Sequence, residues 1–230
     1  MISSGTFPYH SSLRLDNQVL QSKDSARNLG VMISASLSPD VQVSQLCKSL
    51  AFQLKIIRRI RKYLNTDCTK TLIAALFTSR LDFCNSLLAG APRYQLDRLK
   101  RLQNSAARLV TGTSPFSRIT PILVSLHWLP VHARIAFKIA SFVHKTIFGN
   151  APQYLKELLT VRVSDHHLRS AEDRLRLAVP RTRTVRYGDR RFSVTGPRVW
   201  NDLPYCIREI QDYKRFKGQL KSYLFRKHFV

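Results

Sequence analysis

Apolar side chains recur every three or four residues from Val43 to Leu64. On an α-helix this spacing gathers them in a sector about 120° wide, which predicts a helix that begins at Ser38-Pro39-Asp40 and buries this side. Four basic side chains fall on the opposite side: Lys48, Lys55, Arg59 and Lys62. The pattern therefore predicts one face for a hydrophobic core and one wholly cationic face.

A second helix is expected to begin at Thr66-Asp67, with an N-cap and an acidic first turn, and to continue through residues 79–90, SRLDFCNSLLAG. This segment carries several polar side chains inside an apolar run. Arg80 and Asp82 are two positions apart and do not share a helix face, while Cys84 falls on the apolar side. We therefore expect a packed helix here and not a catalytic cluster.

The same period predicts three more long helices, at residues 94–110, 131–149 and 212–229. The first of these ends at Gly112, and together with the two helices before it can form an up-down bundle. The expected core side chains of the later helices and loops include Phe142, Trp200, Phe216, Leu220 and Leu224.

Two parts of the chain show β-like patterns. Residues 13–34 predict a hairpin that turns at Asp16-Asn17, followed by one buried strand, RNLGVMIS, in which Gly30 allows close backbone approach. Three strands are not stable alone, so they are expected at the edge of a larger sheet. Residues 161–204 are rich in arginine, with alternation around Leu177 and a break at Gly196-Pro197. The fold class is thus mostly α with a small β portion.

Charge changes this picture most. The chain of 230 residues has 38 Lys+Arg against 14 Asp+Glu, a net charge of +24. Residues 1–45 are balanced, and the excess begins after them. Such a surface repels itself unless a polyanion neutralises it, so nucleic acid is the first expected partner and an anionic membrane surface the second.

Targeting signals are not evident. No stretch is apolar enough for a membrane span, and MISSGTFPYH lacks the basic and apolar regions of a signal peptide. The spacings of Cys47, Cys68, Cys84 and Cys206 match no zinc pattern. We expect an intracellular protein with reduced thiols, in the nucleus or cytoplasm and not secreted.

The sequence offers little for catalysis. It has no G-x-S-x-G elbow, no phosphate-binding glycine loop and no adjacent aspartates for two-metal chemistry. The neighbours His166-His167 do not share a helix face, which disfavours a metal site. No catalytic residue, metal or cofactor is expected.

A second basic cluster combines arginine with aromatic rings, in PRTRTVRYGDRRF. Guanidinium groups grip phosphates and aromatic faces stack on bases, which favours nucleic-acid contact, although a solvated loop has the same composition. The candidate residues are Arg181, Arg183, Arg186, Tyr187, Arg190 and Arg191.

Five motifs in order resemble one family. They are RNLGVMISASLS followed by a basic amphipathic helix, SRLDFCNSLLAG, LQNSAARLV, LHWLPVHARIAFKI and VWNDLP. Together they resemble the region downstream of the polymerase motifs in LINE-type (non-LTR) retrotransposon reverse transcriptases of the jockey and chicken-repeat groups. The resemblance runs from about Leu13 to the C-terminus. These enzymes copy element RNA into DNA at a nicked chromosomal target.

The resemblance implies a division of the chain. It places residues 1–38 at the last strands of the palm, 39–112 at a thumb-like three-helix bundle and 113–230 at a basic C-terminal region. The palm aspartates and the endonuclease would lie upstream, so no catalysis by the chain alone is expected, and the missing polymerase portion is a candidate partner in trans. Ser34 stands where the family often has Asp.

Three functions then compete. The first is non-sequence-specific binding of RNA, DNA or a hybrid, with the cationic helix along a template–primer duplex. The second is an inert or poorly folded product of a truncated element. The third is a peripheral binder of membrane surfaces that uses the same basic helices.

Overall fold

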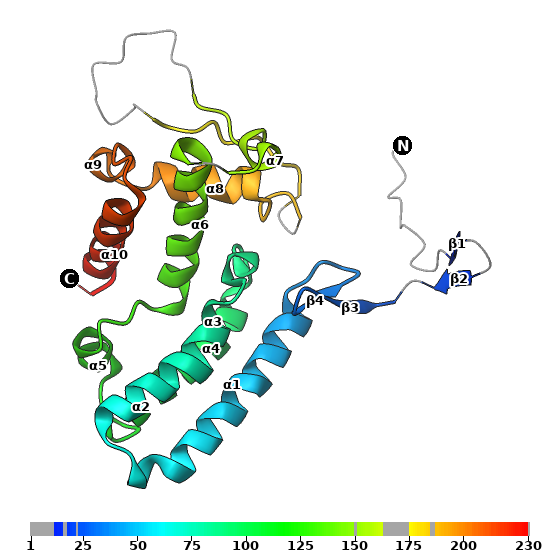
Figure 1. Cartoon of the computed structure of the whole chain (residues 1–230). Coiled ribbons are helices and arrows are strands. Elements are labelled where there is room, and N and C mark those ends of the chain that lie inside the picture. Colours follow the sequence, from blue (N-terminus) through cyan, green and yellow to red (C-terminus); the bar gives the residue numbers. More distant parts are fainter. Residues whose placement is uncertain are drawn as a thin grey trace.

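The computed structural model describes residues 12–15, 18–21, 23–149, 151–162, 175–184 and 187–229. Over these residues the chain is mostly α-helical, with small two-stranded antiparallel sheets near the N-terminus (Figure 1). This coarse architecture is the one that the sequence predicts.

The first hairpin is confirmed. Strands β1 (Ser12–Leu15) and β2 (Gln18–Gln21) pair antiparallel, with Leu15 opposite Gln18. That register leaves Asp16-Asn17 as the connection, although these two residues lie outside the described part of the chain.

The segment RNLGVMIS is a hairpin and not one buried strand, so this prediction was wrong. Strand β3 (Ser25–Asn28) pairs with β4 (Val31–Ser34), and the turn residues Leu29 and Gly30 have φ of 46° and 85°. Two left-handed residues match a type I′ turn, whose twist suits paired strands. Leu29 is consequently 88% exposed. The two hairpins form separate sheets, and the described strands join no larger one.

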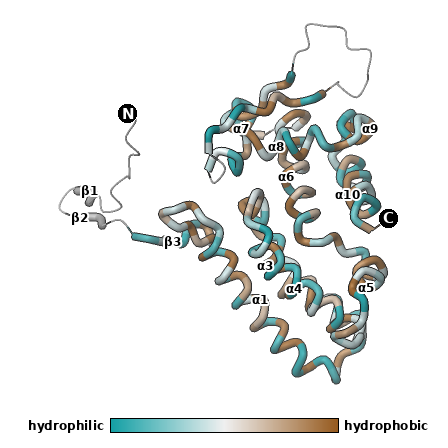
Figure 2. The backbone as a smooth tube through the Cα atoms, turned by 180° about the vertical axis from the view of Figure 1, so that it is seen from behind, coloured by the Kyte–Doolittle hydropathy of each residue, from teal (hydrophilic) through white to brown (hydrophobic). Residues whose placement is uncertain are grey.

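Helix α1 (Asp40–Ile60) follows, and its core side is the predicted one as far as Ile57, whereas Ile60, which the pattern placed in the core, is 39% exposed. The buried side chains are Val43, Leu50, Leu54 and Ile57. The helix ends before Leu64, in a 3-10 turn, η1 (Arg61–Tyr63). Figure 2 shows hydrophobic and hydrophilic residues alternating along α1, as an amphipathic helix requires.

The second helix is shorter than predicted. Its first part, α2 (Thr66–Ile73), is capped by Asn65, whose Oδ1 accepts the Cys68 amide at 2.8 Å. A π-helical stretch, η2 (Ala74–Thr78), leads to α3 (Ser79–Asp82). The helix ends at Asp82 because the backbone of Phe83 is extended (ψ 119°). Cys84 follows in the left-handed region (φ 50°), and SRLDFCNSLLAG continues as a 3-10 turn, η3 (Asn85–Leu88).

Helix α4 (Arg93–Thr111) ends at Gly112 (φ 68°), as predicted. It packs against α1 and α2, which makes the three neighbours in space. Its buried side includes two glutamines that the apolar pattern did not reveal. Gln103 Nε2 donates to the Leu129 carbonyl at 2.7 Å, and Gln95 donates to Asp40 Oδ1.

The second half of the chain is built around α6. The further helices are α5 (Ile119–Ser125), α6 (Val131–Phe148), α7 (Gln153–Lys156), α8 (Phe192–Asn201), α9 (Tyr205–Arg208) and α10 (Tyr213–Phe229). Helix α6 contacts α4, η3, α8 and α10. One set of contacting buried side chains extends from Val43 to Leu224, so the first and second halves share a core.

Core predictions in this half have mixed outcomes. Trp200 is fully buried and its Nε1 donates to the Leu175 carbonyl at 2.8 Å. Phe216, Leu220 and Leu224 are buried as predicted. Phe142, in contrast, is 40% exposed. Gly196-Pro197 does not break the chain but lies inside α8.

Candidate nucleic-acid interface

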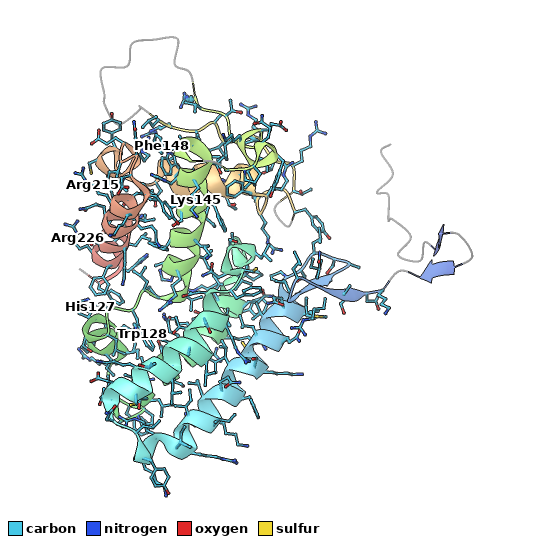
Figure 3. The ribbon with its side chains drawn as sticks, viewed as in Figure 1. His127, Trp128, Lys145, Phe148, Arg215 and Arg226 are labelled. Carbon is cyan, nitrogen blue, oxygen red and sulfur yellow. The ribbon has the colours of Figure 1, made fainter. Side chains whose placement is uncertain are left out.

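The outer face of α1, together with the η1 turn that continues it, carries the four predicted cations; this surface is called the α1 face below. All four side chains are exposed, and none lies within ion-pair distance of a carboxylate in the part of the chain that the structure describes: Lys48, Lys55, Arg59 and Lys62. The inner side of α1 is occupied by α2 and α4, whereas its outer side chains project from the edge of the molecule (Figure 3). The positive charge of this face is therefore uncompensated.

This face is not wholly cationic, which corrects the prediction. Four apolar or aromatic side chains share it: Val41 (39% exposed), Phe52 (59%), Ile56 (39%) and Tyr63 (76%). Lys62 Nζ lies 4.8 Å from the centroid of the Tyr63 ring. The surface thus combines cations that suit phosphates with rings that suit bases or other flat groups.

Arg61 is a basic residue of the same region with a different task. Its Nε donates to the Leu109 carbonyl at 2.9 Å and its Nη2 donates to the Val110 carbonyl at 3.2 Å. A cation at the C-terminal end of α4 also complements the helix dipole. Arg61 therefore joins α1 to α4 and belongs to the scaffold, a role that its position in a basic run did not reveal.

The second cluster is only partly open to a ligand. Arg181, Arg183 and Arg191 are exposed, and Tyr187 is 43% exposed. Arg186 lies outside the described residues.

Arg190 is half-buried, and its guanidinium is bound to the backbone. Its nitrogens donate to three carbonyls: Ala89 (3.2 Å), Leu37 (2.9 Å) and Leu87 (3.0 Å). Burial lowers the pKa of its guanidinium, and the carbonyl oxygens compensate for part of the lost water. The side chain therefore fastens the arginine-rich loop to the start of α1 and to SRLDFCNSLLAG.

A groove lies beside the arginine-rich loop, but none of the four cations of the first cluster lines it. Its volume is about 640 Å³, and Gln42 of α1, Tyr187 and Arg191 are among its lining residues. The rings of Phe142 and Tyr154 complete its wall. The groove therefore adds aromatic and apolar surface next to Arg190 and Arg191, and it does not join the two predicted clusters.

The polar residues of SRLDFCNSLLAG form a junction. Asp82 Oδ2 accepts from Arg134 Nη1 at 2.7 Å, and Arg80 donates to Ser49 of α1. Phe83 packs against Gly30, where an added Cβ would lie 3.3 Å from the ring. These contacts join the β3–β4 hairpin, α1 and α6, which agrees with a structural and not a catalytic interpretation.

Other chemistry was also sought in the described residues. They contain no cluster of three or more His, Cys, Asp or Glu side chains that could hold a metal ion. All four cysteines are free thiols. None of the described helices is long and apolar enough to cross a membrane.

Comparison with known proteins adds no identity: no family model, no curated protein and no solved structure matches the chain.

Proposed function

We propose that the chain binds nucleic acid through its sugar–phosphate backbone, without reading sequence and without catalysis of its own. In this proposal it corresponds to the thumb and C-terminal segment of a LINE-type reverse transcriptase, as its sequence motifs suggest. The observation that carries the binding function is the row of exposed, unneutralised cations on the outer face of α1.

The dimensions of this row suit a phosphate backbone. Within α1, Lys48 and Arg59 are separated by about 16 Å along the helix axis at a rise of roughly 1.5 Å per residue. Duplex DNA carries one phosphate charge per about 1.7 Å of its axis, so several phosphates lie within reach of the row. Lysine and arginine contacts to phosphates position a protein on a duplex but carry no base information.

The test is the salt dependence of binding. The purified chain is titrated with a duplex and with an RNA–DNA hybrid at several salt concentrations, alongside a variant in which Lys48, Lys55, Arg59 and Lys62 are changed to Gln. Each lost phosphate contact removes about 0.9 from the log–log slope, so the variant should flatten it by roughly three to four units. A variant that keeps the parent slope and affinity would show that this face is only solvated.

A matched control separates local from global charge. Changing Arg93, Lys100, Arg101 and Lys156 to Gln removes the same net charge from exposed positions outside α1. We expect that variant to keep most of the parent slope. Gln favours helices, and circular dichroism checks that both variants remain folded.

The exposed apolar side chains of the α1 face give a membrane surface some support as a competing target. Anionic vesicles added to the same titration distinguish the two. Strong binding to vesicles in the absence of nucleic acid, combined with weak binding of nucleic acid, would favour the membrane function.

A further inference from the structure

A second cavity lies away from α1, where the two halves of the chain meet. Its volume is about 480 Å³, within the usual range for small-ligand pockets. Its walls come from the end of α3, the loop between α5 and α6, and the facing sides of α6 and α10. Figure 3 shows His127 and Trp128 in that loop, beside α10.

The cavity is lined by more positive than negative charge. Lys138 of α6 and Lys217 and Lys221 of α10 contribute to its walls, and none of them has a carboxylate partner in the described parts of the chain. The lining carboxylate, Asp82, is already paired with Arg134 at 2.7 Å. Lys138 Nζ lies 5.8 Å from the centroid of the Phe142 ring and Lys217 Nζ lies 5.5 Å from that of Tyr213. Because neither ring neutralises the charge, an anionic group entering the cavity would attract these ammonium groups.

The cavity wall also suits a flat ring. Trp128 and Phe137 provide aromatic surface. Asn85 is 5% exposed, and its Oδ1 is buried without a hydrogen-bond partner among the described residues. Because Asn85 Nδ2 donates toward Asp82 Oδ1 at 3.4 Å, the amide orientation with a free acceptor is the favourable one. This oxygen has almost no accessible surface, so it lies behind the cavity wall and does not face a ligand.

We propose that this cavity binds a nucleoside phosphate, with the phosphate at Lys138, Lys217 and Lys221 and the base against Trp128 and Phe137. The ligand is either a free nucleotide or an unpaired nucleotide at the end of a bound strand, because both present the same chemistry. The site is separate from the α1 face and does not depend on it.

The fluorescence of Trp128 reports occupancy. In a Trp200→Phe chain, Trp128 is the remaining tryptophan. This protein is titrated with AMP, CMP, adenosine and inorganic phosphate. We expect saturable quenching by the nucleotides, and at least tenfold weaker binding of adenosine and of phosphate, because each offers one half of the recognised chemistry. Equal competition by inorganic phosphate would reduce the site to an anion patch and overturn the proposal.

Variants locate the site. Changing Lys217 and Lys221 to Gln should weaken AMP binding at least about tenfold, since hydrogen bonds to charged groups are among the stronger ones. Changing Lys214 and Arg226 to Gln removes the same charge from positions on α10 outside the cavity wall and should leave it unchanged. Equal loss in both pairs would mean that AMP responds only to net charge, and the proposal would be wrong.

Two further measurements distinguish a free nucleotide from a strand end, and the cavity proposal from the proposed function of the α1 face. A duplex with a single-stranded overhang should quench Trp128 more than a blunt duplex if the site accepts a strand end; quenching by free nucleotides alone would assign it to them. The α1 quadruple Gln variant should still bind AMP. Failure of every nucleotide to bind, with duplex binding intact, would overturn the cavity proposal and leave the proposed function standing.

Discussion

The guanidinium of Arg134 and the carboxylate of Asp82 meet at 2.7 Å, joining the start of α6 to the end of α3. Arg134 Nε also donates to the Leu129 carbonyl at 2.9 Å, the same oxygen that accepts from Gln103 of α4. The Arg134 side chain is 14% exposed and that of Asp82 38% exposed, so the pair is screened only in part. Three helical segments are thus tied together by one hydrogen-bonded group.

This arrangement predicts a coupling between the two residues. Arg134→Met removes the ion pair and the bond to Leu129, and should lower the free energy of unfolding by about 2–3 kcal/mol. Asp82→Asn leaves a neutral acceptor and should lower it by about 1 kcal/mol. Urea unfolding of the single and double variants measures the coupling. If the losses of unfolding free energy in the two single variants add up to the loss in the double variant, Arg134 and Asp82 do not stabilise each other.

Two features of the structure disfavour any side chain at Gly90. Its φ is 66°, and a Cβ there would lie 2.8 Å from Arg190 Cγ. Gly90→Ala should therefore destabilise the chain by about 1–2 kcal/mol, from backbone strain and displacement of Arg190. Urea unfolding measures it.

Gly218 provides the matched control. It lies inside α10, with no atom within 4 Å of an added Cβ. Gly218→Ala should stabilise the chain by about 0.5–1 kcal/mol, because alanine is the better helix former. Destabilisation of similar size at both positions would contradict the account given for Gly90.

Stability should fall on mild acidification because three histidines have a lowered pKa. Burial lowers the pKa of His132, His144 and His228. His132 Nε2 and His228 Nδ1 are 3.2 Å apart, and the charges of His228 and Lys100 lower the pKa of His132 further, as Lys227 does for His228. For His144 burial outweighs the opposing hydrogen bond to the Ile210 carbonyl and the charge of Asp212.

The sign follows from proton linkage. The unfolded chain binds protons at these histidines near pH 6.5, before the folded chain does, so the stability present above that pH is lost as pH falls through the lowered folded pKa values. Urea unfolding between pH 8 and pH 5 measures the loss. The double variant His132→Asn, His228→Asn should show a shallower loss than the parent. A parent stability that is flat or rising toward pH 5 would contradict the predicted sign.

The period of the hydrophobic residues was sufficient to predict the long helices. The apolar positions of α1 and α10 come from residues three and four apart, a pattern that any helix with one buried side must show. What the period could not reveal is polar burial. The side chains of Gln95 and Gln103 are buried and donate hydrogen bonds to Asp40 and to the Leu129 carbonyl. Because these partners lie far away in sequence, the pattern of one helix cannot reveal them.

The candidate site also contains some residues whose roles the sequence revealed and others whose roles it did not. The exposure of Lys48 and Lys55 follows from their position opposite the core side of one helix. Arg61 and Arg190 have the same composition around them, yet their guanidinium groups bind carbonyls that are 48 and 153 residues distant in sequence. A basic run therefore predicts charge, whereas only tertiary contacts distinguish a free arginine from one that holds the fold together.

Phe52 and Lys55 lie within one turn of each other on the outer face of α1, and their roles in binding should be separable. Lys55→Gln should flatten the salt slope by about 0.9 and weaken binding most at low salt, because one phosphate contact and its released counterions are lost. Phe52→Ala should weaken the binding of single strands by about 1–3 kcal/mol at every salt concentration without changing the slope, because a ring stacked on a base releases no counterions. Its effect on a blunt duplex should be small, since paired bases are not open to stacking. Titrations of both probes over a range of salt give slope and intercept independently. If Phe52→Ala changes neither intercept, the ring lies outside the contact, and the cations of α1 act alone.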